Sequence, residues 1–406
     1  MTHALAEPDD APTPDRARVE RPDSVAAAAA LLRDSRGTVL LRGGGTQLDW
    51  GGLATDPDLV VDTSELAGVL THNPADMTAS VRAGTRLTDL QDHLAGDNQW
   101  LALDPPTATR GATVGGLLAA GDSGPSRLRY GGLRDLVIGV TLVLADGTVA
   151  RSGGHVIKNV AGYDLAKLVH GSLGSLALVA EVVVRLHPRP AVSLTVAGPA
   201  DAAQATAAAL ALAASPLEPA AVEWVGGADF GTLYVREDGS AAYVETAAAR
   251  TIQLLHTLGV AAHTLPPDEA GGAWYDHAAA VIGATDETVL RVSSRPSELA
   301  SLVRHAAEAA RASGVSLHVV SSAGLGLHTF RLRGSEPAGH AQAMTATRDH
   351  AVSGGASVLL RQRPPEVNEL VDALGPPPST AALLGQVKAQ FDPAGRLAPG
   401  RFTPWY

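Results

Sequence analysis

Three successive glycines near the start of the chain could bind an anion through the main chain. They stand in the run Arg42-Gly43-Gly44-Gly45-Thr46-Gln47, directly after the apolar segment 38–41, which is predicted to be a strand. Because glycine has no Cβ, consecutive N–H groups of such a loop can point at one anion without steric conflict. A pyrophosphate fits this chemistry, and a tight structural turn is the alternative. The spacing is not the G-x-G-x-x-G that opens a helix in a Rossmann domain, so we expect no NAD site of that kind.

Two further glycine-rich stretches carry hydroxyl side chains and could wrap one long ligand together with the first. The second stretch supplies Pro105, Pro106, Thr107, Gly111, Thr113, Val114, Gly115, Gly116, Ser123 and Gly124. The third stretch begins with KNVAGYD at 158–164 and supplies Gly171, Gly174 and Ser175. Because the interval 105–132 shows no periodicity, we predict a long loop there, and loops of that length are usually functional or disordered.

Composition excludes several classes of function. The chain has 406 residues and no cysteine, so it cannot supply disulfides, a thiol nucleophile, iron–sulfur ligands or cysteine ligands to zinc. A net charge of −11 argues against a nucleic-acid partner, which would need a basic face. The three lysines lie at 158, 167 and 388 and fit no GxxxxGK[ST] phosphate loop. No segment is long and apolar enough for membrane insertion. The absence of disulfides fits a cytoplasmic protein, which the complex could attach peripherally to the inner membrane.

The elements that must position these stretches indicate an α+β chain. We expect a disordered tail over 1–23, a first domain over 24–190 that holds the glycine-rich stretches, a second α+β domain over 191–378, and a C-terminal helix and tail over 379–406. Ser24 is predicted to cap a helix over 25–33, and Asp146-Gly147 to turn a hairpin. In the second domain, alternating patterns predict strands at 193–197, 221–225, 232–236, 241–245, 289–293, 316–321 and 328–333, covered by helices on one face.

Together these motifs resemble the FAD-binding domain of the vanillyl-alcohol-oxidase/p-cresol-methylhydroxylase (PCMH) superfamily. The likeness is carried by Gly-Gly-Gly-Thr at 43–46, by PPT and TVGG at 105–107 and 113–116, and by KNVAGYDL at 158–165. Within the superfamily the chain is similar to the FAD-binding subunits of bacterial glycolate oxidase, and KNVAGYDL and the C-terminal FDPAGRLAPGRF are the most specific pieces. The resemblance runs from Ser24 to the C-terminus in the same order.

The resemblance implies a PCMH-type FAD-binding domain of two α+β subdomains over 24–190, followed by a cap or substrate domain with an antiparallel sheet. The run 42–47 would cradle the pyrophosphate, the second stretch would follow the cofactor toward the flavin, and Gly171, Gly174, Ser175 and Val179 would lie near the adenosine. The C-terminal segment would return to the FAD domain. The activity implied is oxidation of glycolate to glyoxylate, with electrons passed to an iron–sulfur subunit beside a catalytic FAD-containing subunit.

Three departures from the family pattern bear on this expectation. Thr46 stands where covalent relatives carry histidine, so FAD should be bound non-covalently. Leucines occupy both polar places of the turn 323–328, which makes a metal site doubtful, and Ala398 replaces an asparagine near the C-terminus. We therefore assign no catalytic residue and expect substrate oxidation to centre on the partner. The alternatives are a self-sufficient FAD-dependent dehydrogenase of 2-hydroxy acids or alcohols, and a non-catalytic scaffold that retains the fold.

Overall fold

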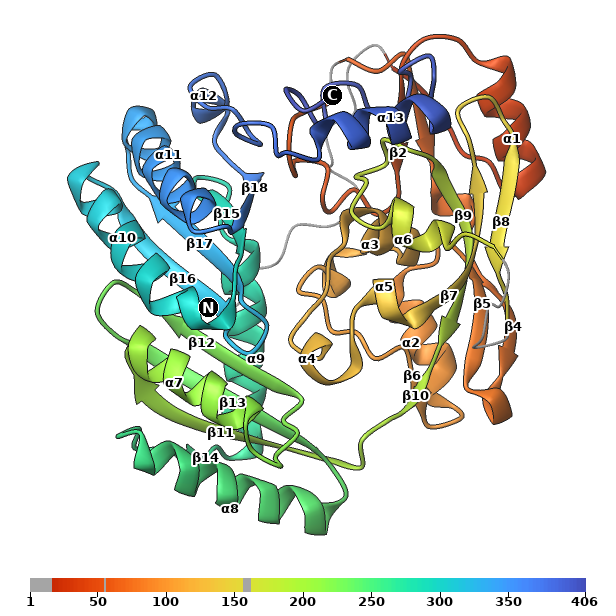
Figure 1. The fold of residues 1–406 in the computed structure, drawn as a ribbon. Coiled ribbons are helices and arrows are strands. Elements are labelled where there is room, and N and C mark those ends of the chain that lie inside the picture. Colours follow the sequence, from red (N-terminus) through yellow and green to blue (C-terminus); the bar gives the residue numbers. More distant parts are fainter. Residues whose placement is uncertain (1–16, 55, 156–161) are drawn as a thin grey trace. The chain divides into compact units, whose positions relative to one another are not determined.

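The computed structural model describes residues 17–54, 56–155 and 162–406, which form two compact units (Figure 1). The first unit takes the described residues up to Gly124 together with Gly131–Arg189 and Pro376–Tyr406. The second unit takes Pro190–Gly375 and the short segment Pro125–Tyr130. The glycine-rich stretches of the sequence therefore belong to the first unit.

A small parallel sheet holds the glycine run in the first unit. Its strands, in spatial order, are β1 (Arg18–Glu20), β3 (Leu59–Asp62) and β2 (Val39–Arg42). Helix α1 (Val25–Asp34) packs Ala28 and Leu32 against the apolar side chains of β2 and β3. Ser24 caps this helix, as predicted, by accepting a hydrogen bond from the Ala27 N–H at 3.2 Å.

The second sheet of the first unit is antiparallel. Its strands, in spatial order, are β4 (Val69–Asn73), β5 (Thr78–Arg82), β9 (Leu178–Arg185), β7 (Val137–Val143) and β8 (Val149–Gly153). The helices that share its core are α2 (Leu87–Ala95), α3 (Val114–Ala120), α5 (Leu133–Leu136) and α6 (Leu165–Val169). A two-stranded ribbon pairs β6 (Gln99–Trp100) with β10 (His187–Pro188). The predicted turn at Asp146 and Gly147 joins β7 to β8.

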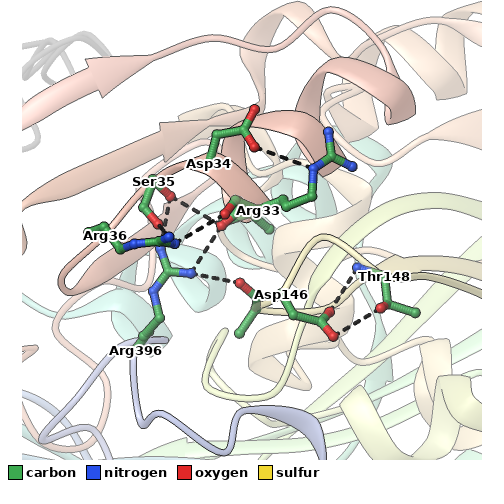
Figure 2. Close-up of polar contacts among 9 residues, drawn as sticks. Arg33, Asp34, Ser35, Arg36, Asp146, Thr148 and Arg396 are labelled. Atoms are coloured by element: carbon green, nitrogen blue, oxygen red, sulfur yellow. Dashed lines mark hydrogen bonds and ion pairs between the residues drawn. The ribbon is translucent and has the colours of Figure 1, made fainter.

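Arg396 is one of the residues that fasten the C-terminal segment to the rest of the first unit. After helix α13 (Ala381–Phe391), Leu397 lies beside Val39 of β2 in a parallel bridge. The Arg396 guanidinium donates to the carbonyl oxygens of Leu32, Gly37 and Ala145 at 3.0, 3.0 and 2.8 Å. It also donates to the Ser35 hydroxyl at 2.8 Å (Figure 2). These acceptors belong to the end of α1, to the loop that follows it and to the β7–β8 turn, so Arg396 ties all three to the C-terminal segment.

The second unit is built on an eight-stranded sheet in which each pair of neighbours is antiparallel. In spatial order the strands are β14 (His263–Thr264), β11 (Val192–Ala200), β13 (Gly231–Gly239), β12 (Ala221–Gly226), β16 (Ser316–Ser322), β17 (Leu327–Arg333), β15 (Thr288–Ser293) and β18 (Ser357–Gln362). The short helices α4 (Arg127–Tyr130) and α12 (Pro365–Asn368) also belong to this unit.

Long helices cover both faces of this sheet. Helices α7 (Ala202–Ala213), α8 (Ala241–Thr257), α10 (Leu299–Ala312) and α11 (Pro337–Ser353) share one apolar core with Val222 and Trp224 of β12. Glu223 alternates with these residues and so faces the other side. There it is paired with His277 of α9 (Pro267–Ile282) at 2.8 Å, so α9 covers the opposite face.

The fold class expected from the sequence is confirmed, and several local expectations are wrong. Arg18–Glu20 form a strand where disorder was expected; residues 1–16 of that tail lie outside the described residues. The interval 105–132 contains helix α3, whose Gly115 is required because a Cβ there would collide with Ala83. Residues 241–245 open helix α8 because alanine favours helix once β13 has ended at Gly239. Within the described part of the chain, no helix is long and apolar enough to cross a membrane.

Candidate FAD site

A cavity lies in the first unit beside the glycine run. It is lined by Leu41, Arg42, Gly43, Gly44, Gly45, Thr46, Gln47, Leu48, Thr63, Ala83, Thr113, Gly115, Gly116, Ala119, Ala120, Leu173, Gly174, Ala177, Leu178, Val179 and Arg401. The residues come from the end of β2, the start of α3, the start of β9 and the C-terminal segment.

The cavity brings together part of the predicted site. The predicted residues among its lining are Arg42, Gly43, Gly44, Gly45, Thr46, Gln47, Thr113, Gly115, Gly116, Gly174 and Val179. The predicted residues outside the lining are Pro105, Pro106, Thr107, Gly111, Val114, Ser123, Gly124, Gly171 and Ser175. Arg401 is the most consequential lining residue that sequence reasoning missed, although it stands in the C-terminal motif that carried the resemblance.

The main chain of the glycine run supplies the donors of this site. The N–H groups of Gly43, Gly44 and Gly45 donate no hydrogen bond to the described part of the chain. By contrast, the first N–H groups of helix α3 are already used: those of Val114 and Gly115 bond the carbonyls of Thr85 and Ala83 at 3.0 and 2.8 Å. Since main-chain donors need a partner, the glycine run fits an anionic ligand and the start of α3 does not.

Two of these glycines are also required by packing. A Cβ on Gly43 would collide with the Thr113 hydroxyl, and a Cβ on Gly44 would collide with the Gly111 carbonyl. The first and second glycine-rich stretches therefore touch backbone to backbone at this place. The glycine run can therefore be both a tight structural turn and a site for an anion, because the close contact between the two stretches also forms the wall of the cavity.

The positive charge of Arg42 is balanced by a neighbour. Its guanidinium lies 2.9 Å from an oxygen of Asp62, and Arg21 lies 3.3 Å from the same oxygen. Burial alone would raise the pKa of Asp62, but hydrogen bonds from Ser64 and Arg42 outweigh it and lower that pKa. Asp62 thus stays ionised between the two guanidinium groups, and Arg42 enters the cavity wall as part of an ion-paired group and not as a separate cation.

Gln47, Thr107 and Asp122 form a buried polar network next to the cavity. The Gln47 side-chain amide donates to the Thr107 hydroxyl at 3.1 Å and to the Asp122 carboxylate at 2.9 Å. Thr107 donates to the same carboxylate oxygen at 3.1 Å, and the other oxygen accepts the Ser123 N–H at 3.0 Å. Although Thr107 and Ser123 do not line the cavity, this network joins them to Gln47, which does.

Arg401 holds the loop that follows the glycine run. Its guanidinium donates to the carbonyl oxygen of Leu48 and to those of Trp50 and Gly52 at 3.0 and 3.2 Å. The Gly52 N–H in turn donates to the Arg401 carbonyl at 3.0 Å. A buried arginine from the C-terminal segment thereby fixes the loop 48–52 and forms part of the cavity wall.

The other predicted residues support the site from behind or lie apart from it. Val114 is buried in the core of the antiparallel sheet, Gly124 packs against the carbonyl of Asp104, and the Gly171 N–H bonds the Leu118 carbonyl at 3.1 Å. The Ser175 hydroxyl bonds the Ser172 carbonyl at 2.8 Å. Pro105 accepts the Ala108 N–H at 3.0 Å and so shapes a turn that Pro106 continues. Residues 158–161 of the KNVAGYDL motif lie outside the described residues.

The turn 323–328 of the second unit offers no ligand set. His328 is buried between the hydroxyls of Ser321 and Ser294 at 2.8 and 3.0 Å, and burial lowers its pKa to about 4. Leu325 and Leu327 have no polar side-chain atoms to add. Within residues 17–54, 56–155 and 162–406, no cluster of three or more His, Asp or Glu side chains could hold a metal ion.

Comparison with known proteins names the ligand of the first unit. Residues 16–153 match the family described as FAD binding domain. The chain carries an FAD-binding domain. Glycolate oxidase subunit GlcE of Escherichia coli is 38% identical over 128 residues, which are 32% of this chain and 37% of that protein. Glycolate oxidase subunit GlcD of Bacillus subtilis is 32% identical over 53% of this chain and 45% of that protein.

Other relatives and solved structures match along most of the chain. D-lactate dehydrogenase of Archaeoglobus fulgidus is 27% identical over 93% of this chain and 89% of that protein. The solved structure of an alkyldihydroxyacetonephosphate synthase superposes with a TM-score of 0.69 at 17% identity, covering 94% of this chain and 75% of the other. The chain spans less than half the length of the two glycolate oxidase subunits it matches. These matches show an FAD-binding domain within residues 16–153 and, through the solved structure, a fold shared along most of the chain.

Proposed function

We propose that this chain is the FAD-binding subunit of a multi-subunit dehydrogenase that oxidises glycolate to glyoxylate. The observation that carries the proposal is the cavity beside Gly43–Gly45, whose main-chain donors have no partner in the described protein. The likeness to the glycolate oxidase subunits supports the choice of complex. FAD is proposed to be bound non-covalently, because Thr46 offers no atom that could form a histidyl link.

Within this proposal the lining residues have distinct tasks. Gly43–Thr46 bind the pyrophosphate through main-chain N–H groups, and the Arg42–Asp62 pair keeps the strand end beside them in place. Gly174 and Val179 line the part of the wall proposed to face the adenosine. FAD, when bound, supplies the chemistry of accepting electrons that the complex removes from the α-carbon of a 2-hydroxy acid. The predicted residues outside the lining, from Thr107 to Ser175, act by supporting this wall.

The second unit bears on how the work is divided in the complex. The leucines of the turn 323–328 have no polar side-chain atoms. His328 is buried, and both its ring nitrogens are hydrogen-bonded to Ser321 and Ser294, so it has no nitrogen left to bind a metal or to accept a proton from substrate. We therefore propose that substrate oxidation is centred on a catalytic FAD-containing partner, and that this chain serves electron transfer, assembly or both. Because the chain has no cysteine, the iron–sulfur cluster belongs to another subunit. A cytoplasmic complex is part of the same proposal.

The domain limits are proposed as an FAD-binding domain over 24–190, a cap domain over 191–378, and a C-terminal segment over 379–406 that completes the first. The bonds of Arg396 and Arg401 support that last assignment.

A second candidate function is a self-sufficient FAD-dependent dehydrogenase of 2-hydroxy acids. It is favoured by the likeness to D-lactate dehydrogenase, which extends over 93% of this chain. A scaffold that has lost FAD is disfavoured, because the cavity retains its main-chain donors.

The test is to add FAD to the purified chain in the absence of oxygen and to record its visible spectrum before and after the addition of glycolate. Acetate, which lacks the hydroxyl group, is the control addition. We expect a bound flavin that stays oxidised with glycolate until the partner subunits are added. Bleaching by glycolate or D-lactate in the chain alone would establish the self-sufficient dehydrogenase instead. No flavin after added FAD would overturn both functions.

A further inference from the structure

The orientation of the Gln47 amide is determined by Asp122. An ionised carboxylate only accepts hydrogen bonds, so the amide must turn its NH₂ group toward Asp122, as it does at 2.9 Å. The second N–H is used by the Thr107 hydroxyl at 3.1 Å. Thr107 can accept it because its own hydrogen is donated to Asp122 at 3.1 Å. Both donors of Gln47 are therefore committed to the protein.

The amide oxygen of Gln47 is left for a ligand. Gln47 lines the cavity, and its Oε1 makes no hydrogen bond to the described part of the chain. The reversed amide would place Oε1 against Asp122, where two acceptors repel, so the side chain cannot offer a donor without breaking the network. At this point the cavity wall accepts hydrogen bonds and does not donate them.

We infer that Asp122 is a positioning residue which, through Gln47, makes the cavity select a hydrogen-bond donor of its cofactor. The chemical class of that donor is an N–H or O–H group, which FAD offers on its flavin ring, ribityl chain and adenosine. Asp122 is 1% exposed and acts without touching the ligand, whereas Gln47 is the residue that touches it. The inference rests on the proposed function in one respect, namely that the guest of the cavity is FAD.

The experiment is a double-mutant cycle on FAD affinity, measured by quenching of flavin fluorescence as FAD is titrated into apoprotein. The four proteins compared are the natural chain, the single variants Asp122→Asn and Gln47→Met, and the double variant. The asparagine side chain of the first variant can donate as well as accept, which frees the Gln47 amide to reverse, so we expect about a tenfold loss of affinity. Gln47→Met removes the acceptor and should cost about as much. When Gln47→Met is already present, adding Asp122→Asn should cost less than about twofold.

Additive losses in the cycle would overturn the inference, because they would mean that Asp122 acts on the fold and not through Gln47. Natural affinity in Gln47→Met would overturn it too. That variant changes only a half-buried loop position, so it keeps the test open should Asp122→Asn fail to fold. Failure of the natural chain to bind FAD would instead refute the proposed function, and a change in the thermal midpoint of the apoproteins reports any structural effect separately.

Discussion

Thr46 is the position at which the assignment of the glycine run can be tested with least damage to the protein. It lines the cavity, and its side chain makes no hydrogen bond within the described residues. Substitutions at Gly43 or Gly44 would confound the test, because any Cβ there collides with the neighbouring stretch. We predict that Thr46→Asp weakens FAD binding strongly. Thr46→Asn, which introduces a side chain of the same shape as aspartate and no charge, should weaken it little.

The size of the effect follows from Coulomb's law. A carboxylate at position 46 and a phosphate bound to the main-chain N–H groups of the same loop would be separated by about 5 Å. At an effective dielectric constant of about 20 the repulsion is about 3 kcal/mol for each charge pair, and in bulk water about 1 kcal/mol. Because the cavity opens to solvent, we expect the dissociation constant to rise about tenfold to a hundredfold over that of Thr46→Asn.

The assay is a fluorescence titration of FAD into each apoprotein at low salt and again at about 1 M salt, where the Debye length is about 3 Å. The difference between the aspartate and asparagine variants should shrink at high salt, since it is electrostatic. Equal FAD affinities for the two variants at low salt, with unchanged thermal midpoints, would refute the placement of the pyrophosphate at this loop.

Three further predictions concern groups away from the cavity wall. Burial raises the pKa of Glu237, so its charged form destabilises the fold increasingly as pH rises above the usual carboxyl range. Glu237→Gln should therefore raise the thermal midpoint more at pH 7.5 than at pH 4.5. An equal gain at both pH values would contradict this. Burial lowers the pKa of His328 from 6.5 to about 4. The stability that neutral His328 contributes is therefore fully present above pH 6.5 and is lost as pH falls toward 4. The loss in the free energy of unfolding is at most about 3 kcal/mol. Urea titrations of His328→Gln should therefore show a flatter dependence on pH in that window, and a slope like that of the natural chain would count against the burial argument. Arg396→Ala leaves three carbonyl groups and a hydroxyl without their donor and should lower the free energy of unfolding by about 3 kcal/mol. Arg396→Lys should have a free energy of unfolding between those of the natural chain and Arg396→Ala. A loss under about 0.5 kcal/mol in Arg396→Ala would show that water replaces these bonds.

Features that depend only on residues adjacent in the sequence could be predicted from it. The cap at Ser24, the turn at Asp146 and Gly147, and the strand before the glycine run are local patterns, and the structure confirms each of them. Helix α3 escaped prediction because its two glycines are poor helix formers. The close approach of Gly115 to Ala83 requires glycine at that place, and no local pattern reveals a contact between residues so far apart.

Site residues divide along the same line. The glycine run could be found because an anion loop needs residues without Cβ, whereas the motif around Arg401 and the glycines around Asp122 do not show that these two side chains serve the site. Arg401 lines the cavity and bonds the loop 48–52, and Asp122 acts through Gln47. Several predicted residues, such as Val114 and Gly124, are close in sequence to residues of the glycine-rich stretches that line the cavity but pack against other parts of the protein. A motif identifies the segment that forms a wall and not the side chains that face inward.

The charges of the first unit indicate what holds an anionic cofactor there. Arg42 is balanced by Asp62, and the chain as a whole carries a net charge of −11, so long-range attraction of FAD is not available. The first N–H groups of helix α3 are bonded to the protein already. Recognition of the pyrophosphate then depends on the directions of a few main-chain N–H groups in a glycine-rich loop, which is flexible by composition. A site of that kind needs its loop held from outside, and Arg401 and the Asp122 network are the parts of this structure that hold it.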